Sequence, residues 1–171
     1  GATRMMDFFD EQRMSRLYEK FILEYYRREH PRLNASASFI DWVLDDGVTD
    51  GLPAMRSDVT LSAGGRVLII DAKYHTSTMQ TYYEKQSVKS ENLYQIFTYV
   101  KNKQAALERV GESVEVSGML LYAATDEDIQ PDVTYRMSGN RIGATTLDLD
   151  RPFEEIRAQL DGIADMLTSP S

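Results

Sequence analysis

The sequence predicts an α/β domain in which helices flank a mixed β-sheet. Three observations lead to this prediction: apolar residues recur at helical spacing in long segments, apolar runs of strand length lie between them, and glycine-containing turns join some of these runs. Because helices precede, interrupt and follow the strands, they would cover a sheet built from several parts of the chain. The length suits one domain over residues 1–171, and we treat Gly1 and Ala2 as a cloning remnant.

The first part of the chain predicts one helix and three strands. The helix spans residues 8–29 and ends at His30-Pro31, because the residue before a proline disfavours the helical conformation. The Gly64-Gly65 pair predicts a tight hairpin turn, since both positions need a positive φ. Residues 74–90 are polar without a clear period, and we expect a loop there. The predicted strands are residues 36–44, 54–62 and 66–73.

The second part predicts a helix, a buried strand, a hairpin and a closing helix. Ser90 is a suitable cap for the first of these helices, and Gly111 lies beyond its end. The second hairpin is expected to turn around Gly139-Asn140, and Pro152 suits the first turn of the last helix. In order, these elements are residues 91–109, 116–124, 132–137 with 141–148, and 151–167.

Composition excludes several classes of protein. There is no cysteine and there are only two histidines, so that disulfides, thiolate zinc sites and histidine-rich metal sites are not expected. A metal would need carboxylate oxygens, which favour Mg²⁺, Mn²⁺ or Ca²⁺. No stretch approaches the roughly 18 apolar residues of a membrane helix, the start has no signal-peptide pattern, and we expect a cytoplasmic protein. A net charge of −8 argues against strong non-specific nucleic-acid binding without a local basic patch or a partner.

The hairpin around Gly64-Gly65 predicts a chemical site. If the turn lies on these glycines, Ala63 faces Arg66, and stepping along both strands places Asp58 directly opposite Asp71. Facing residues share one side of the sheet, with Cβ atoms about 4.5–5.5 Å apart. Strand alternation adds Lys73 to that side. The other side carries a good core face of Val59, Leu61, Leu68 and Ile70.

Two facing carboxylates destabilise a hairpin unless another group compensates their charge. A divalent cation would do so, held by Asp58, Asp71 and a backbone carbonyl such as that of Ala72, together with waters. Lys73 would then hold an attacking water or stabilise developing negative charge. A surface hairpin with incidental acids is equally compatible with the spacing alone. The well-specified register between the two aspartates favours the site.

Asp58, the glycine hairpin and Asp71-Ala72-Lys73 after the apolar run of residues 67–70 resemble the PD-(D/E)XK nuclease motif, with Ser57 in place of the usual proline. Longer stretches resemble the McrC proteins of McrBC-type modification-dependent restriction systems, and the resemblance runs over about residues 14–167. These stretches are LYEKFILEYY (17–26), MRSDVTL (55–61), VLIIDAKYH (67–75) and ENLYQIFTYVKN (91–102).

The resemblance implies a restriction-endonuclease-like core and a Mg²⁺-dependent DNA endonuclease, with Mn²⁺ as a substitute. It also implies a 5-methylcytosine-specific system in which a GTP-hydrolysing AAA+ partner of McrB type brings the nuclease to DNA. Only the carboxyl-terminal nuclease part of the family is matched, and its amino-terminal docking region has no counterpart in the sequence. No Walker P-loop is present, so we expect this chain to bind no nucleotide.

The resemblance also suggests supporting residues. Gln95 and Tyr99 are four residues apart and share a helix face. In the family they would neighbour the active site, orienting Lys73 or contacting phosphate. The alternative is a solvated helix face with Tyr99 at the edge of the core. Glu19 in the first helix would be an additional acidic metal ligand, and the alternative is a solvated carboxylate beside Lys20.

Two other functions are compatible with the sequence. In the first, the nuclease-like site is silent and the domain serves assembly or regulation, which the acidic net charge favours. In the second, the nuclease acts on RNA or on unmodified DNA outside a restriction complex.

Overall fold

A computed structural model of the chain describes residues 2–74, 79–82, 85–127 and 130–170. Its centre is a five-stranded mixed sheet in the order β3-β4-β7-β9-β8, which confirms the predicted fold class. Strand β4 pairs antiparallel with β3 and parallel with β7, while β9 pairs parallel with β7 and antiparallel with β8. The strands are β3 (Val59–Ala63), β4 (Arg66–Lys73), β7 (Glu115–Ala123), β8 (Val133–Met137) and β9 (Asn140–Leu147).

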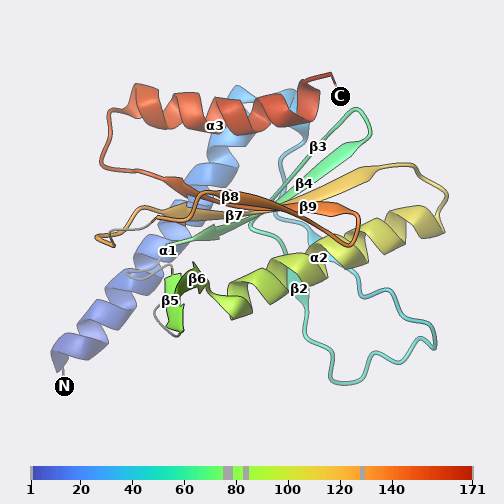
Figure 1. The fold of residues 1–171 in the computed structure, drawn as a ribbon, viewed down its shortest axis with the longest axis horizontal. Coiled ribbons are helices and arrows are strands. Elements are labelled where there is room, and N and C mark those ends of the chain that lie inside the picture. Colours follow the sequence, from blue (N-terminus) through green and yellow to red (C-terminus); the bar gives the residue numbers. More distant parts are fainter. Residues whose placement is uncertain (1, 75–78, 83–84, 128–129, 171) are drawn as a thin grey trace.

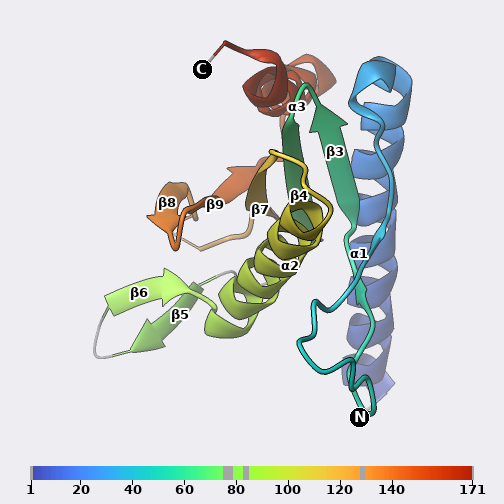
Figure 2. The ribbon, with the colours of Figure 1, turned by 90° about the vertical axis from the view of Figure 1, so that its right-hand side faces the viewer.

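Three helices cover the two faces of this sheet. Figure 1 and Figure 2 show α2 (Ser90–Arg109) on one face, with α1 (Ala2–Glu29) and α3 (Phe153–Thr168) on the other. Helix α1 begins before the predicted residue 8, because the helix-favouring residues that precede it continue the helix beyond the apolar pattern. Helix α2 has Lys89, not Ser90, at its N-cap position. Among the described residues, no helix is long and apolar enough to cross a membrane.

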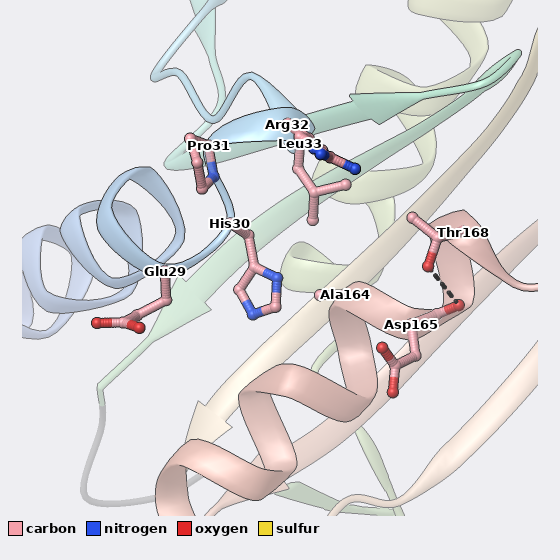
Figure 3. Close-up of a pocket in the computed structure, with 8 residues that line it drawn as sticks. All are labelled: Glu29, His30, Pro31, Arg32, Leu33, Ala164, Asp165 and Thr168. Atoms are coloured by element: carbon pink, nitrogen blue, oxygen red, sulfur yellow. Dashed lines mark hydrogen bonds between the residues drawn. The ribbon is translucent and has the colours of Figure 1, made fainter.

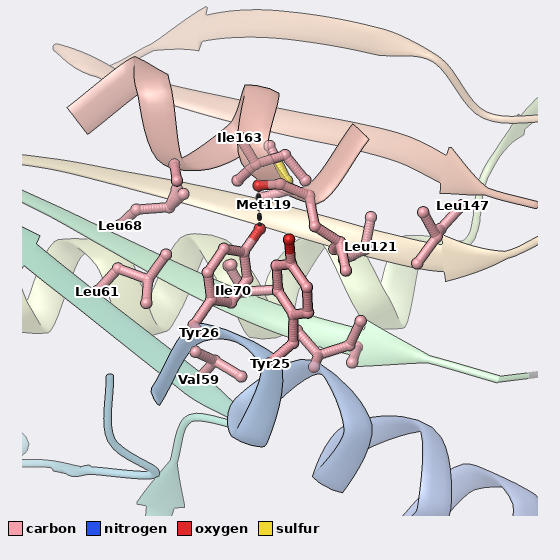
Figure 4. Close-up of a cluster of buried hydrophobic side chains, with 14 of the residues drawn as sticks. Tyr25, Tyr26, Val59, Leu61, Leu68, Ile70, Met119, Leu121, Leu147 and Ile163 are labelled. Atoms are coloured by element: carbon pink, nitrogen blue, oxygen red, sulfur yellow. Dashed lines mark hydrogen bonds between the residues drawn. The ribbon is translucent and has the colours of Figure 1, made fainter. Parts of the chain in front are cut away.

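Each face of the sheet has its own apolar core. Val59, Leu61, Leu68 and Ile70 pack against α1 and α3, as the predicted core face requires (Figure 4). Residues that alternate with these along β4 face α2, where Val67 and Ile69 pack against Ile96, Tyr99 and Val100. Since strand side chains alternate between faces, Asp71 and Lys73 also point toward the side covered by α2.

Polar contacts join α1 to α3 at the edge of the first core. The Tyr26 hydroxyl donates to the Leu160 carbonyl at 2.8 Å, and the Tyr25 hydroxyl donates to Asp161 Oδ1 at 2.6 Å. His30 Nε2 lies 2.7 Å from the same carboxylate oxygen. A cavity of about 260 Å³ opens beside this junction, between the 3₁₀ turn η1 (Pro31–Leu33) and the end of α3 (Figure 3). These contacts hold the C-terminal end of α1 against α3.

The strands predicted over residues 36–44 and 54–62 differ from the prediction. The first range contains only β1 (Phe39–Ile40), and the second is divided into β2 (Met55–Arg56) and the start of β3; β1 and β2 form a separate two-stranded sheet, and Ser36 bridges to Thr60. The break falls at Ser57, whose N–H donates to the Ser38 carbonyl at 2.9 Å and whose hydroxyl lies 2.7 Å from Thr60 Oγ1. The chain therefore changes its pairing partner immediately before Asp58.

Two further predictions were wrong. The segment expected to be a loop over residues 74–90 contains the strands β5 (Met79–Tyr82) and β6 (Lys85–Val88), and residues 75–78 and 83–84 lie outside the described part. The second hairpin turns on Ser138-Gly139, both with positive φ, instead of Gly139-Asn140. The reason is that the Asn140 side chain is buried, where it donates to the Val116 carbonyl at 2.8 Å.

The close approach of α2 to the sheet depends on Gly118 in β7. A Cβ there would lie 2.7 Å from Val100 Cγ2 and 2.8 Å from Ile96 Cγ1, both on α2. We therefore expect Gly118→Ala to lower the free energy of unfolding by about 1–3 kcal/mol, measured by urea denaturation.

A matched control is Gly162→Ala in α3, where an added Cβ meets nothing within 4 Å. This exposed helix position should gain about 0.5–1 kcal/mol from the alanine. If both alanine variants were equally stable, α2 would not be held at the distance that the structure shows.

Candidate active site

The β3–β4 hairpin has the register that the sequence predicts. Ala63 pairs with Arg66 and Val59 pairs with Ile70, so that the next facing positions are Asp58 and Asp71. The strand ladder stops before this pair. In place of a strand partner, Asp58 Oδ2 accepts a hydrogen bond from the Ala72 N–H at 2.8 Å. The Asp58 side chain is thereby fixed to the end of β4.

Asp71 is buried, with only 5% of its surface exposed. Its Oδ2 lies 2.9 Å from Lys73 Nζ, which forms an ion pair on one face of β4. Even so, among the described residues no donor makes a well-aligned hydrogen bond to this oxygen. The lysine thus offsets the charge of Asp71 but leaves Oδ2 with unused acceptor capacity in a buried position.

Helix α2 supplies the groups that hold Lys73. Its Nζ donates to Gln95 Oε1 at 2.9 Å, and Gln95 Nε2 donates to the Tyr99 hydroxyl at 3.1 Å. Because the ammonium can only donate, this contact fixes the orientation of the Gln95 amide. The structure therefore brings Gln95 and Tyr99 together with Lys73 and Asp71 in one polar chain.

Two residues of this region were not identified as site residues from the sequence. Asn92 and Tyr122 are both buried, and Asn92 Nδ2 donates to the Tyr122 hydroxyl at 3.0 Å. Burial raises the pKa of Tyr122 to about 12, Asn92 opposes this change, and the charge of Asp71 adds to it. Tyr122 faces Lys73 across the β4–β7 pair. Two features of the sequence could have indicated them: Tyr122 brings a polar hydroxyl into an apolar strand, and Asn92 lies one helical turn before Gln95.

The site carries more negative than positive charge. Burial raises the pKa of Asp58 well above its ordinary range, and the contact with Asp71 and the charge of Glu19 add to this, while the Ala72 N–H opposes it. Burial also raises the pKa of Glu19, as does the charge of Asp71, against the opposing charges of Lys73 and Arg16. Three carboxyl groups therefore repel one another around a single close lysine.

These features fit a hard divalent cation. Such a cation would offset the repulsion between Asp58 and Asp71 and use the remaining acceptor capacity of Asp71 Oδ2 beside Lys73. The Ala72 N–H points toward Asp58, and in a strand the C=O of the same residue points to that side as well. In the part of the chain that the structure describes, no three His, Cys, Asp or Glu side chains gather as a metal cluster. Glu19 lines a groove with Asp58, and its role as a further ligand stays a prediction.

The mixed sheet, with the acidic pair and the lysine on one hairpin, is consistent with a PD-(D/E)XK-like core. The family model described as "McrBC 5-methylcytosine restriction system component" matches residues 12–123, which is more than half of the sequence. The chain belongs to this family, and the resemblance to McrC proteins is confirmed.

A curated relative agrees with this assignment. The chain is 31% identical over 169 residues to the "Type IV methyl-directed restriction enzyme EcoKMcrBC" of Escherichia coli (strain K12). The match covers 96% of this chain and 47% of that protein. The chain therefore spans about half the length of the curated relative that it matches.

The raised pKa of Asp58 predicts how the metal-free domain responds to pH. A carboxyl group whose pKa is higher in the folded state stabilises the fold below its unfolded pKa, and this contribution is lost as the pH rises through the folded pKa. In EDTA, we therefore expect the melting temperature to fall between weakly acidic and alkaline pH. Asp58→Asn should remove part of that fall and be more stable than the wild type at pH 8 by about 1–3 kcal/mol.

The isosteric asparagine keeps an acceptor for the Ala72 N–H, which makes this comparison clean. Asp45→Asn serves as the control, because Asp45 is exposed. Parallel pH profiles for wild type and Asp58→Asn would show that the two aspartates do not repel each other as the structure implies.

Proposed function

We propose that this chain is the metal-dependent DNA endonuclease domain of a McrBC-like, 5-methylcytosine-specific restriction system. The observation that carries the proposal is the placement of Lys73 between Asp71 and Gln95, beside the facing Asp58, in a member of this family. The reaction is hydrolysis of a phosphodiester bond. A water oxygen bonds to phosphorus, the bond to one sugar oxygen breaks, and that oxygen leaves with a proton as a hydroxyl.

Asp58, Asp71 and the Ala72 carbonyl are the groups that would hold Mg²⁺, with Mn²⁺ as a substitute. When bound, such an ion activates water and neutralises charge on a phosphate. Lys73 lies at the boundary between this acidic pair and α2, with its ammonium anchored by Asp71 and Gln95. From there it donates to the attacking water or to a phosphate oxygen that gains charge in the transition state.

Gln95 and Tyr99 act through Lys73. The Tyr99 hydroxyl holds the Gln95 amide, and the amide oxygen holds the lysine ammonium. A lysine side chain has several rotatable bonds, so this support limits the positions that its ammonium samples. Both residues are therefore positioning residues, and their loss should reduce the rate without removing the charged groups.

The biological context comes from the relative, whose name describes a methyl-directed restriction enzyme. By this similarity, we propose that recognition of the modified base and GTP hydrolysis belong to an AAA+ partner of McrB type. The sequence of this chain contains no Walker P-loop, and its net charge is −8. Both properties suit a domain that is brought to DNA by another polypeptide.

The cleavage test uses methylated plasmid DNA, Mg²⁺ or Mn²⁺, GTP and the AAA+ partner. We expect Asp71→Asn and Lys73→Ala to reduce the cleavage rate by about 100-fold or more, because each removes a charged group from the reacting centre. Lys103→Ala is the control, since Lys103 lies on α2 outside the Lys73–Gln95–Tyr99 chain. Cleavage at the wild-type rate by both site variants would refute the nuclease assignment.

A silent assembly or regulatory module is the second candidate. It is favoured by the finding that, within the described ranges, no three potential acidic or histidine ligands form a metal cluster.

Titration calorimetry with Mn²⁺ separates the two functions. We expect wild-type protein to bind Mn²⁺ and Asp58→Asn to bind it at least about tenfold more weakly, since one charged ligand is lost. Binding that does not depend on Asp58, or no binding at all, would favour the silent module.

A further inference from the structure

A groove of about 400 Å³ opens beside Asp58. One wall is α1, which contributes Arg16, Glu19, Lys20 and Leu23 at the spacing of a single helix face. The other wall is formed by two neighbouring segments, one with Ala37 and the other with Arg56, Ser57 and Asp58. Figure 2 shows the chain after η1 running back alongside α1, which forms this second wall.

Positive charge gathers in the outer part of this groove. Arg16, Lys20 and Arg56 are exposed, and within the described ranges none of them forms an ion pair with an acidic side chain. The carboxyl groups of Glu19 and Asp58 lie in the same groove. Basic side chains thus line a groove that leads to the acidic pair, in a chain whose net charge is −8.

The Arg56 guanidinium is held in place by two contacts. Its Nε donates to the Ala37 carbonyl at 3.2 Å, and its Cζ lies 5.2 Å from the centre of the Phe39 ring. In the described part of the chain, its two terminal nitrogens have no hydrogen-bond partner. A guanidinium that is oriented in this way presents a fork of N–H donors, which matches the oxygens of a phosphate.

The groove and the candidate active site share one segment of chain. Arg56 precedes Ser57, which is buried and fastened to Ser38 through its N–H at 2.9 Å, and Asp58 follows directly. The neighbouring segment with Ala37 is tied to α1, because Arg27 Nε donates to the Ala35 carbonyl at 3.3 Å. The backbone segments that carry the basic side chains therefore keep a fixed position relative to Asp58.

We propose that this groove binds the phosphodiester backbone of DNA, with Arg16, Lys20 and Arg56 contacting the phosphates next to the one that is cleaved. The inference rests on the proposed nuclease function and adds the path of the substrate strand to it. Arg16, Lys20 and Arg56 are available to phosphates because no described acidic side chain forms an ion pair with them, and the acidic inner end admits a phosphate only with a cation. The DNA strand therefore lies along the basic side chains and reaches Asp58 from their side of the groove.

A second groove provides the matched control. Arg136 and Arg141 face each other across the β8–β9 hairpin and line a groove of about 520 Å³ at the opposite end of β4 from Asp71. Neither forms an ion pair with a described acidic side chain. Neutralising this pair changes the net charge by the same amount as neutralising Arg16 and Lys20, without touching the proposed path.

The test measures binding of a labelled DNA duplex by fluorescence anisotropy in EDTA, so that cleavage plays no part. We expect Arg16→Ala combined with Lys20→Ala to weaken binding about tenfold or more at low salt and to reduce the salt slope by about two. Arg56→Ala alone should reduce the slope by about one. Arg136→Ala combined with Arg141→Ala should bind like the wild type.

Each result has a defined meaning. Wild-type affinity in both groove variants, equal losses in the control pair, or no salt-dependent binding by the wild-type chain would overturn the proposed path. Thermal melts check folding, and Lys20→Glu, an exposed change on the same face of α1, provides a second variant that should weaken binding at least as strongly. If the groove variants lose affinity while Asp71→Asn and Lys73→Ala cleave at the wild-type rate, the groove binds DNA but the nuclease assignment fails.

Discussion

The hydrogen bond from the Ala72 N–H to Asp58 Oδ2 determines the geometry of the candidate site. The β3–β4 ladder ends at the Val59–Ile70 pair, and beyond this point a backbone donor of β4 has no strand partner. Asp58 satisfies that donor with its carboxylate and is thereby held against Asp71. One contact thus terminates the β3–β4 ladder and places two acidic groups together. The charge repulsion between these groups must be offset by a cation or a lysine.

Helix α2 can support this arrangement only because it approaches the sheet closely. Gly118 in β7 leaves room for Ile96 and Val100, and the same helix face carries Gln95 and Tyr99 toward Lys73. Packing and site chemistry are consequently joined, since a displacement of α2 would lengthen the contact that holds the lysine. The buried Asn92–Tyr122 pair lies on the same side of the sheet, next to Asp71, and keeps this region polar without opening it to solvent.

The sequence predicted the parts of the site that follow from local geometry. Glycine conformation and strand alternation were sufficient to place Asp58 opposite Asp71, because the hairpin turn fixes the register. Helical spacing placed Gln95 and Tyr99 on one face. Contacts between distant segments were not predictable: the interruption at Ser57 depends on Ser38, and the shifted turn at Ser138-Gly139 depends on a hydrogen bond from Asn140 to Val116.

The acidic net charge of the protein is compatible with the proposed DNA path because the basic residues that line the groove lie close together. A net charge of −8 opposes DNA binding only when the charges act at similar distances from the phosphates. Arg16, Lys20 and Arg56 line the groove next to Asp58, whereas Arg151 and Arg157 lie elsewhere and are paired with acids. Under the proposed function, an acidic domain with a short basic path would bind DNA weakly in solution and orient it once a partner has brought it close. The proposed nuclease would then separate affinity from positioning, so that cleavage depends on the partner that delivers the DNA.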